Sequence, residues 1–339
     1  MTDLDRIQSC ISNRLDRSAV GAKRIAAVIG GSPSRYSKSP ALWNAAFQAL
    51  AMDAVYVALD LDEGRLAELM AAVKESGRVL GLNVTVPHKL AALKHLDALE
   101  ESARKTGAVN TITRAGDGRL SGANTDGAGF VQSLLTPPAG GASPIVESLE
   151  SLSGIDALVL GAGGAARAVA FALGERIGKG RLAIANRNRQ SAESLAAEVA
   201  ALYGNAAAVS DEEIAAHAVS TGLIVNCTTR GQGGGALEPY SALASARPEA
   251  PAGPESIDAN NRASLELAGR VPQSTVFYDL VYHPAESVFL RHGRLTGHRT
   301  QNGRGMIVAQ AVEAFFSHIC RQELERAGLH TEETRKRVL

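Results

Sequence analysis

Residues 157–174 read ALVLGAGGAARAVAFALG, an apolar run followed by a glycine turn and an alanine-rich segment. The turn matches G-x-G-x-x-[GA] with Gly161, Gly163 and Ala166, and Gly164 is an additional glycine. Gly161 permits a tight turn, Gly163 lets the backbone approach a pyrophosphate, and the small Ala166 lets a helix pack closely on the strand. Such glycines alone often serve only packing. Because the strand, turn and helix are all present, we interpret the stretch as a dinucleotide site.

The segment after the next predicted strand, residues 182–185, indicates which dinucleotide binds. It reads NRNR at 186–189, and no carboxylate follows until Glu193. NAD sites place an Asp or Glu about 20 residues beyond the glycines, to bind the ribose 2′-hydroxyl. Guanidinium groups suit a 2′-phosphate instead. The alternative is a solvated basic loop, which is plausible for Arg189 and less so for Arg187. The sequence therefore favours NADP.

The rest of the chain alternates short apolar runs with helical segments, which is typical of parallel α/β sheets. A helix is expected over the first 20 residues, and Pro87 is expected to begin another. Two segments are rich in Pro, Gly and Ser: residues 136–154 are interpreted as a linker or an inserted loop, and residues 231–256 as a surface insertion with one short helix. Strands are expected at 25–29, 54–59, 80–86, 108–112, 157–160, 182–185, 223–225 and 276–278.

Composition excludes several classes of protein. The 339 residues carry 35 Lys+Arg and 35 Asp+Glu, so the formal net charge is zero, which argues against a nucleic-acid partner. No apolar run approaches the roughly 20 residues that span a bilayer, so no membrane association is expected. The three cysteines form neither a C-x-x-C pair nor an even disulfide framework. We expect a cytoplasmic protein of about two domains.

Three polar clusters stand at predicted strand ends or helix starts, where open α/β sheets bind ligands. They are GSPSRYSKSP at 31–40, GLNVTVPHK at 81–89 and AVNTITRAGDGRLSGANTDGAGF at 108–130. Helix capping explains Ser39 but not Ser37 as well, and Asp126 can be a simple N-cap. Lys89 in the first turn of a helix opposes the helix dipole unless a carboxylate compensates. Asp126 is the candidate partner, since a Lys–Asp pair can handle a proton.

The motifs YSKSP, NVTVPHK, AVNT, NTDG, GAGGAARA, NR, DLVY, and NGRGM followed by AQA occur in this order. Together they resemble the shikimate dehydrogenase family over nearly the whole length, from about Ile25 to about His318. The resemblance implies an α/β protein of two domains. Residues 1–135, completed by the C-terminal helices at 302–339, would be a substrate-binding domain with a mostly parallel sheet. Residues 136–301 would be a Rossmann-type NADP domain.

The resemblance also implies reversible NADPH-dependent reduction of 3-dehydroshikimate to shikimate, a step of aromatic amino acid (chorismate) biosynthesis. Lys89 and Asp126 would be the catalytic pair, with no metal, in a monomer or homodimer. The residues implied for the substrate are Ser37, Ser39, Thr85, Asn110, Asp126, Tyr282 and Gln310. Those implied for the cofactor are Gly161, Ala162, Gly163, Gly164, Ala165, Asn186, Arg187, Asn188, Thr228, Leu280, Gly303 and Met306.

Two observations keep alternatives open. Gln310 lies within the apolar stripe of a predicted C-terminal helix, and periodicity alone favours a satisfied core glutamine over a pocket residue. On the cofactor side, Ser191 stands where the family has a second phosphate-binding arginine, so Arg189 is an alternative, and residues 226–235 place Arg230 nearby. The competing functions are a quinate or quinate/shikimate dehydrogenase using NAD, disfavoured by Ser39, and a catalytically idle dinucleotide-binding regulatory protein.

Overall fold

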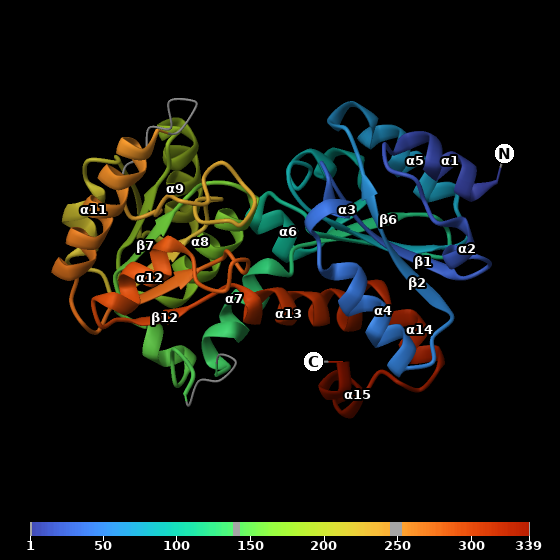
Figure 1. Ribbon diagram of the computed structural model, residues 1–339. Helices are drawn as coiled ribbons and strands as arrows, with labels where there is room; N and C mark the ends of the chain where they lie inside the picture. The colour runs from blue at the N-terminus through green and yellow to red at the C-terminus, as the bar shows by residue number, and fades with distance from the viewer. Residues whose placement is uncertain (1, 138–142, 245–252, 339) are drawn as a thin grey trace. The chain divides into compact units, whose positions relative to one another are not determined.

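The computed structural model describes residues 2–137, 143–244 and 253–338 (Figure 1). The chain folds into two compact units. The first comprises Met1–Asp126 together with Val308–Leu339, and the second comprises Gly127–Ile307. The C-terminal segment therefore belongs to the same unit as the N-terminal segment.

The first unit is built around a six-stranded sheet. Its elements in chain order are α1 (Asp3–Cys10), α2 (Arg17–Val20), β1 (Arg24–Gly30), α3 (Pro33–Tyr36), α4 (Ser39–Ala49), β2 (Ala54–Asp60), η1 (Glu63–Arg65), α5 (Leu66–Glu75), β3 (Val79–Val84), η2 (Ala91–His95), β4 (Ala98–Leu99), α6 (Glu101–Thr106), β5 (Thr111–Arg114), β6 (Leu120–Ala123), η4 (Ala314–Ile319), α14 (Arg321–Arg326) and α15 (Glu332–Val338). Helix α7 (Asp126–Leu135) begins at the boundary of the unit, and α13 (Arg304–Glu313) crosses it.

The sheet of the first unit is mixed, and its strand order is β2-β1-β3-β5-β6-β4. Strand β1 is parallel to β2 and β3, whereas β5 is antiparallel to both β3 and β6. Consequently the carboxyl ends of β1, β3 and β6 lie at the same edge as the amino end of β5. Residues that follow three strands and precede a fourth are thereby gathered in one place.

Alternation along β1 shows how the sheet is covered. Ile25, Ala27 and Ile29 join the apolar core beneath α1 and α5, while Ala26 and Val28 join a second core formed with α4, η4 and α14 (Figure 1). Side chains of a strand point alternately to the two faces. The apolar run in β1 is therefore continuous because helices cover both faces.

The second unit contains a sheet of six parallel strands. Its elements are α7, η3 (Leu149–Leu152), β7 (Ala157–Leu160), α8 (Gly164–Arg176), β8 (Leu182–Ala185), α9 (Arg189–Tyr203), β9 (Ala206–Val209), α10 (Ile214–Ala218), β10 (Leu223–Asn226), α11 (Pro254–Arg270), β11 (Val276–Asp279), α12 (Val288–Leu295), β12 (Arg299–Gln301) and α13.

The strand order of this sheet, β12-β11-β10-β7-β8-β9, is that of a doubly wound fold. The chain proceeds outward from β7 through β8 and β9, then returns to β10 on the other side of β7. Ala157 and Val159 pack beneath α7, α8 and α9, and Leu158 and Leu160 beneath α10, α11 and α12. The reversal between β7 and β10 is a topological switch point, where such sheets bind ligands beyond the carboxyl ends of the strands. The predicted α/β fold class is confirmed.

Two local predictions are wrong. The first 20 residues do not form one helix: α1 ends at Cys10 and α2 begins at Arg17. Between them, the Asn13 side chain bonds to the backbone of strand β2 instead, donating to the Ala58 carbonyl at 2.9 Å and accepting from the Asp60 N–H at 2.7 Å. Pro87 does not begin an α-helix either. Residues 86–90 form turns, in which the Lys89 carbonyl accepts a 2.8 Å bond from the Val109 N–H, and a 3₁₀ turn begins only at η2.

The predicted linker and insertion are described in part. Residues 138–142 and 245–252 lie outside the described residues. The described remainder of 136–154 contains η3, and Pro254 begins α11, a 17-residue helix that extends well beyond the predicted insertion. Over the described ranges, no helix combines the length and apolarity needed to cross a bilayer.

Candidate active site

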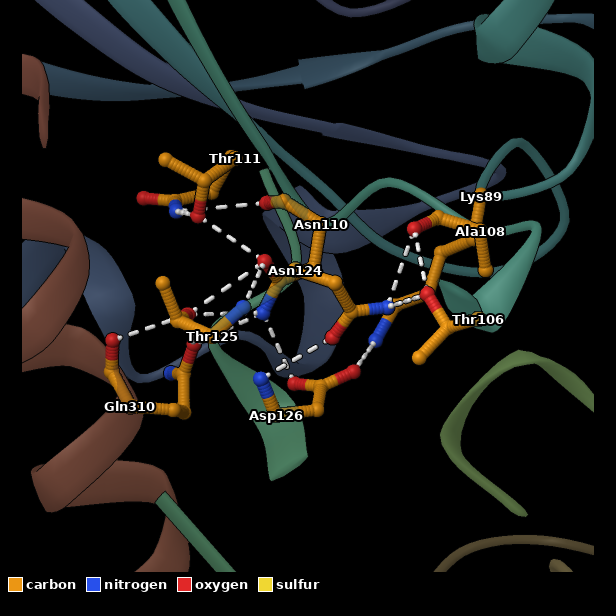
Figure 2. Close-up of polar contacts among 10 residues, drawn as sticks. Lys89, Thr106, Ala108, Asn110, Thr111, Asn124, Thr125, Asp126 and Gln310 are labelled. Carbon is orange, nitrogen blue, oxygen red and sulfur yellow. Dashed lines mark hydrogen bonds and ion pairs between the residues drawn. The ribbon is translucent and has the colours of Figure 1, made fainter. Parts of the chain in front are cut away.

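A buried lysine–carboxylate pair stands at the shared strand edge of the first unit. Lys89 follows β3, Asp126 follows β6, and their Nζ and Oδ2 atoms are 2.5 Å apart (Figure 2). The two side chains are only 13% and 7% exposed. Removing two charges from water is costly and is offset only when further hydrogen bonds satisfy them. The structure therefore brings together the pair proposed from the sequence, although the reason is strand order rather than a helix dipole.

The backbone on each side holds this pair in position. The Lys89 carbonyl is fixed by Val109, and the ring of the preceding residue, His88, is fully buried against the Leu61 carbonyl at 2.8 Å. On the other side, the Asp126 N–H donates to the Asn124 side chain at 3.0 Å. Each charged residue thus extends from a segment that is tied to neighbouring strands.

Asn110 supplies the second contact of the Asp126 carboxylate. Its amide nitrogen donates to Asp126 Oδ1 at 2.8 Å and lies 2.9 Å from the Thr125 hydroxyl. Its amide oxygen accepts from the Thr125 N–H and from the Thr111 hydroxyl, both at 2.9 Å. Asn110 is 3% exposed, so its orientation is fixed by these partners. A carboxylate held by both a lysine and an amide presents a defined geometry to a ligand.

Gln310 reaches the same cluster from α13. Its side-chain oxygen lies 3.3 Å from the amide nitrogen of Asn110, and its backbone carbonyl accepts from the Thr125 hydroxyl at 3.1 Å (Figure 2). The residue is half-buried rather than enclosed in the core. Periodicity favoured a core glutamine, but the contacts place Gln310 beside the Lys–Asp pair.

The serine segment lies at the end of the adjacent strand β1. Ser37 Oγ accepts from the Ser39 N–H at 3.2 Å, so one hydroxyl caps the turn into α4. Thr85 packs against the end of β1, because a Cβ placed on Gly30 would lie 2.4 Å from the Thr85 Cγ2 atom. Burial raises the pKa of Tyr36, and a hydrogen bond with Thr85 opposes that rise. Ser37, Ser39 and Thr85 therefore belong to neighbouring loops of the edge that carries Lys89.

Sequence reasoning did not assign roles to several residues that support the site. The Tyr56 hydroxyl donates to Asn83 Oδ1 at 2.7 Å, and Asn83 Nδ2 lies 3.3 Å from the Asn110 carbonyl. Burial raises the pKa of Tyr56, and a hydrogen bond with Ser39 lowers it. A polar chain thus links Ser39 to Asn110. A tyrosine in an apolar strand gives no signal of this role, whereas the polar Asn83 in a buried strand does.

In the second unit, the glycine turn has the geometry that a pyrophosphate requires. Gly161 has φ +117°, and a Cβ there would lie 3.1 Å from the Cys227 backbone. Gly163 is the N-cap of α8 without a side-chain cap bond, and a Cβ there would enter open space. The first helical bond is donated by the Arg167 N–H to the Gly163 carbonyl, so the N–H groups at Gly164, Ala165 and Ala166 face the helix start. The exposed approach and the helix N-terminus both suit an anion.

The loop after β8 contains the predicted phosphate ligands. Asn186 Nδ2 donates to the Asn188 carbonyl at 3.0 Å, and the Asn188 side chain caps α9 by accepting from Ser191 at 3.2 Å. Arg189 pairs with Glu193 at 2.8 Å. Arg187 is exposed and has no ion-pair partner among the described residues. Within this loop, Arg187 is therefore the arginine that is available to an anionic ligand.

The loop after β10 rests on a buried carboxylate. Thr228 donates through its N–H and its hydroxyl to Asn226 Oδ1, at 2.9 and 2.8 Å. Asn226 in turn donates to Asp279 at 2.9 Å, and Ser287 donates to the same carboxylate at 2.5 Å. Burial raises the pKa of Asp279 to about 7 despite these hydrogen bonds. Asp279 thus fixes the predicted cofactor residue Thr228 through Asn226.

The remaining predicted residues lie after β11 and at the start of α13, in the second unit. A Cβ on Gly303 would lie 2.2 Å from the Leu280 carbonyl, so these two segments touch. Met306 is 6% exposed and belongs to the apolar core. Tyr282 follows β11, and its contact with substrate stays a prediction. Ala162 completes the glycine turn and is half-buried.

The buried Lys–Asp pair of the first unit and the glycine turn of the doubly wound second unit define a dinucleotide-dependent dehydrogenase. Residues 29–112 match the model of the shikimate dehydrogenase substrate binding domain. The chain is 40% identical over 299 residues to the shikimate dehydrogenase (NADP+) of Symbiobacterium thermophilum, covering 87% of this chain and 88% of that protein. The chain belongs to the shikimate dehydrogenase family.

Solved structures agree with this assignment. Shikimate 5-dehydrogenase from Thermus thermophilus, in complex with NADP(H) and shikimate, is 33% identical with a TM-score of 0.66, over 93% of this chain and 100% of that one. Quinate dehydrogenase from Corynebacterium glutamicum, in complex with NAD, is 26% identical with a TM-score of 0.69, over 93% and 98% of the two chains. The structural relatives thus include proteins of both competing substrate classes.

We expect Lys89→Ala to lower kcat by roughly 100- to 10,000-fold, the usual loss for a general acid. The affinity for NADPH should stay within about two-fold, because Lys89 belongs to the first unit and the glycine turn to the second. Steady-state assays and NADPH titration measure the two effects. Lys94→Ala, an exposed lysine in η2, is the matched control and should keep the wild-type rate. Normal turnover in Lys89→Ala would remove this residue from the mechanism.

A second prediction concerns Asp279. Its pKa of about 7 in the folded state exceeds the ordinary value of 3.8, so between these values the folded chain holds a proton that the unfolded chain releases. Its contribution to stability is therefore fully present below the ordinary value of 3.8 and is lost as the pH rises towards 7. Asp279→Asn cannot titrate. The melting temperature of Asp279→Asn minus that of wild type should therefore increase by several degrees as the pH rises from 3.8 to 7. A difference that stays constant with pH would contradict the assigned pKa.

Proposed function

We propose that this chain catalyses the reversible, NADP-dependent interconversion of 3-dehydroshikimate and shikimate. The observation that carries the proposal is the buried Lys89–Asp126 pair, surrounded by amide and hydroxyl groups at one sheet edge. A small polyhydroxylated acid requires many directed hydrogen bonds, and a buried ion pair beside them supplies the proton handling. Family membership makes the chain an NADP-dependent oxidoreductase that acts on a CH–OH group.

Lys89 has the position of the proton donor. Reduction of a ketone requires a hydride, which bound NADPH supplies, and a proton for the oxygen that becomes the alcohol. The Nζ of Lys89 carries that proton, and the 2.5 Å contact with Asp126 directs it. In the oxidative direction, the same nitrogen accepts the hydroxyl proton. Asp126 also accepts a hydrogen bond from a neighbouring substrate hydroxyl, because Asn110 orients its second oxygen.

Substrate recognition falls to the groups around the pair. The hydroxyls of Ser37, Ser39 and Thr85 follow β1 and β3, and the amides of Asn110 and Gln310, 3.3 Å apart, lie beside Asp126. These groups both donate and accept, as a ring with several hydroxyls requires. Tyr282 of the second unit is the further ligand that we propose.

Binding of the cofactor falls to the second unit. The glycine turn and the start of α8 suit the pyrophosphate, and the exposed Arg187 suits a 2′-phosphate. We propose that the first unit, predicted as residues 1–135 with 302–339, is the substrate domain, and that the second unit, predicted as residues 136–301, is the NADP domain. A cytoplasmic monomer or homodimer is the state that we propose, and sedimentation of the purified chain tests its assembly.

The function is tested by steady-state oxidation of shikimate and quinate, each with NADP+ and with NAD+. We expect kcat/KM to be greatest for shikimate with NADP+. Ser39 supports shikimate, because quinate-preferring relatives tend to carry threonine there. A marked preference for quinate with NAD+ would reject both choices. Binding of NADPH without turnover of either acid would instead favour a regulatory protein.

A further inference from the structure

Two arginines lie in the loops that flank the glycine turn on either side. Strands β8 and β10 both pair with β7, so the loops that follow them flank the glycine turn after β7. Arg187 lies in the loop after β8, and Arg230 lies in the loop after β10. The second loop touches the turn directly, because a Cβ on Gly161 would lie 3.1 Å from the Cys227 backbone.

The backbone of Arg230 is fixed by Asn226, the last residue of β10, and by Thr228 in the loop that follows. Its N–H donates to the Thr228 hydroxyl at 3.1 Å, and its carbonyl accepts from Asn226 at 3.2 Å. One guanidinium nitrogen, Nη1, donates to the Ala244 carbonyl at 2.9 Å. The side chain is therefore half-buried and held in one direction rather than free to move through solvent.

The charges of the two arginines act on each other. Burial lowers the pKa of Arg230, and the positive charge of Arg187 lowers it further, while the carboxylate of Asp211 opposes both effects. Two guanidinium groups within electrostatic reach, one of them partly desolvated, disfavour each other. A phosphate dianion between them would relieve that repulsion and would accept charged hydrogen bonds from guanidinium groups that reach it.

We propose that Arg230 is the second arginine of the site for the ribose 2′-phosphate, acting with Arg187, and that it selects NADP over NAD. This proposal rests on the proposed NADP-dependent function. The second positive charge at the phosphate, which Ser191 cannot supply, would thus come from the loop after β10. It also explains why Arg189, which pairs with Glu193, is not required for that role.

The test is calorimetric titration of the full chain with NADP+, NAD+ and 2′,5′-ADP. Arg230→Gln should weaken NADP+ and 2′,5′-ADP binding by about 10- to 100-fold, the usual effect of a charged hydrogen bond. The affinity for NAD+ should change by less than about two-fold. Arg230→Lys keeps the charge and should lose less than Arg230→Gln. Arg181→Gln is the matched control, because this exposed arginine precedes β8, pairs with Asp156 and should change neither affinity.

Three results would overturn the proposal. The first is that Arg230→Gln leaves the affinity for NADP+ unchanged. The second is that it lowers the affinities for NADP+ and NAD+ equally, which would indicate that Arg230 only holds the backbone at Ala244. Arg189→Gln could instead reproduce the selective loss while Arg230→Gln does not. Arg187→Gln separates this inference from the proposed function. If it loses NADP+ selectively while Arg230→Gln does not, only the role of Arg230 fails; if the wild type binds NAD+ as tightly as NADP+, the proposed cofactor preference fails.

Discussion

The burial of Lys89 against Asp126 is the constraint on which the first unit depends. Two charges at 2.5 Å inside a protein are stable only where the remaining acceptor sites of the carboxylate are filled. Asn110 fills one, and Asn110 is itself held by Thr111 and Thr125. Strand order is what makes this arrangement available. Because β5 runs antiparallel between β3 and β6, residues from three loops reach one edge.

The second unit depends on a different constraint, the approach of backbone to backbone at the glycine turn. A side chain at Gly161 would meet the Cys227 segment, so the loops after β7 and β10 are packed as one surface. The buried Asp279 stabilises these loops by accepting a hydrogen bond from Asn226, the last residue of β10. The same packing fixes Thr228 and Arg230, so the proposed recognition of the cofactor phosphate would depend on contacts that also stabilise this end of the sheet.

Much of this could be predicted from the sequence, for identifiable reasons. The strands β7 and β8 matched their predicted bounds, because short apolar runs beside a glycine turn give a strong local signal. The Lys89–Asp126 pair was also predicted, although from a helix dipole that the structure does not contain. The antiparallel insertion of β5 gave no local signal. The role of Tyr56 therefore remained hidden. Gln310 was implied only by the family resemblance and not by periodicity, because its partners Asn110 and Thr125 are distant in sequence.

A double-mutant cycle on kcat for shikimate oxidation tests most directly whether Lys89 and Asp126 act as one unit. Lys89→Ala, Asp126→Asn and the double variant are compared, each checked for folding by thermal melting. Residues that serve one proton transfer are strongly non-additive. We expect the double variant to be no slower than the more damaged single variant. A loss equal to the product of the two single losses would show that the residues act independently and would contradict the proposed mechanism.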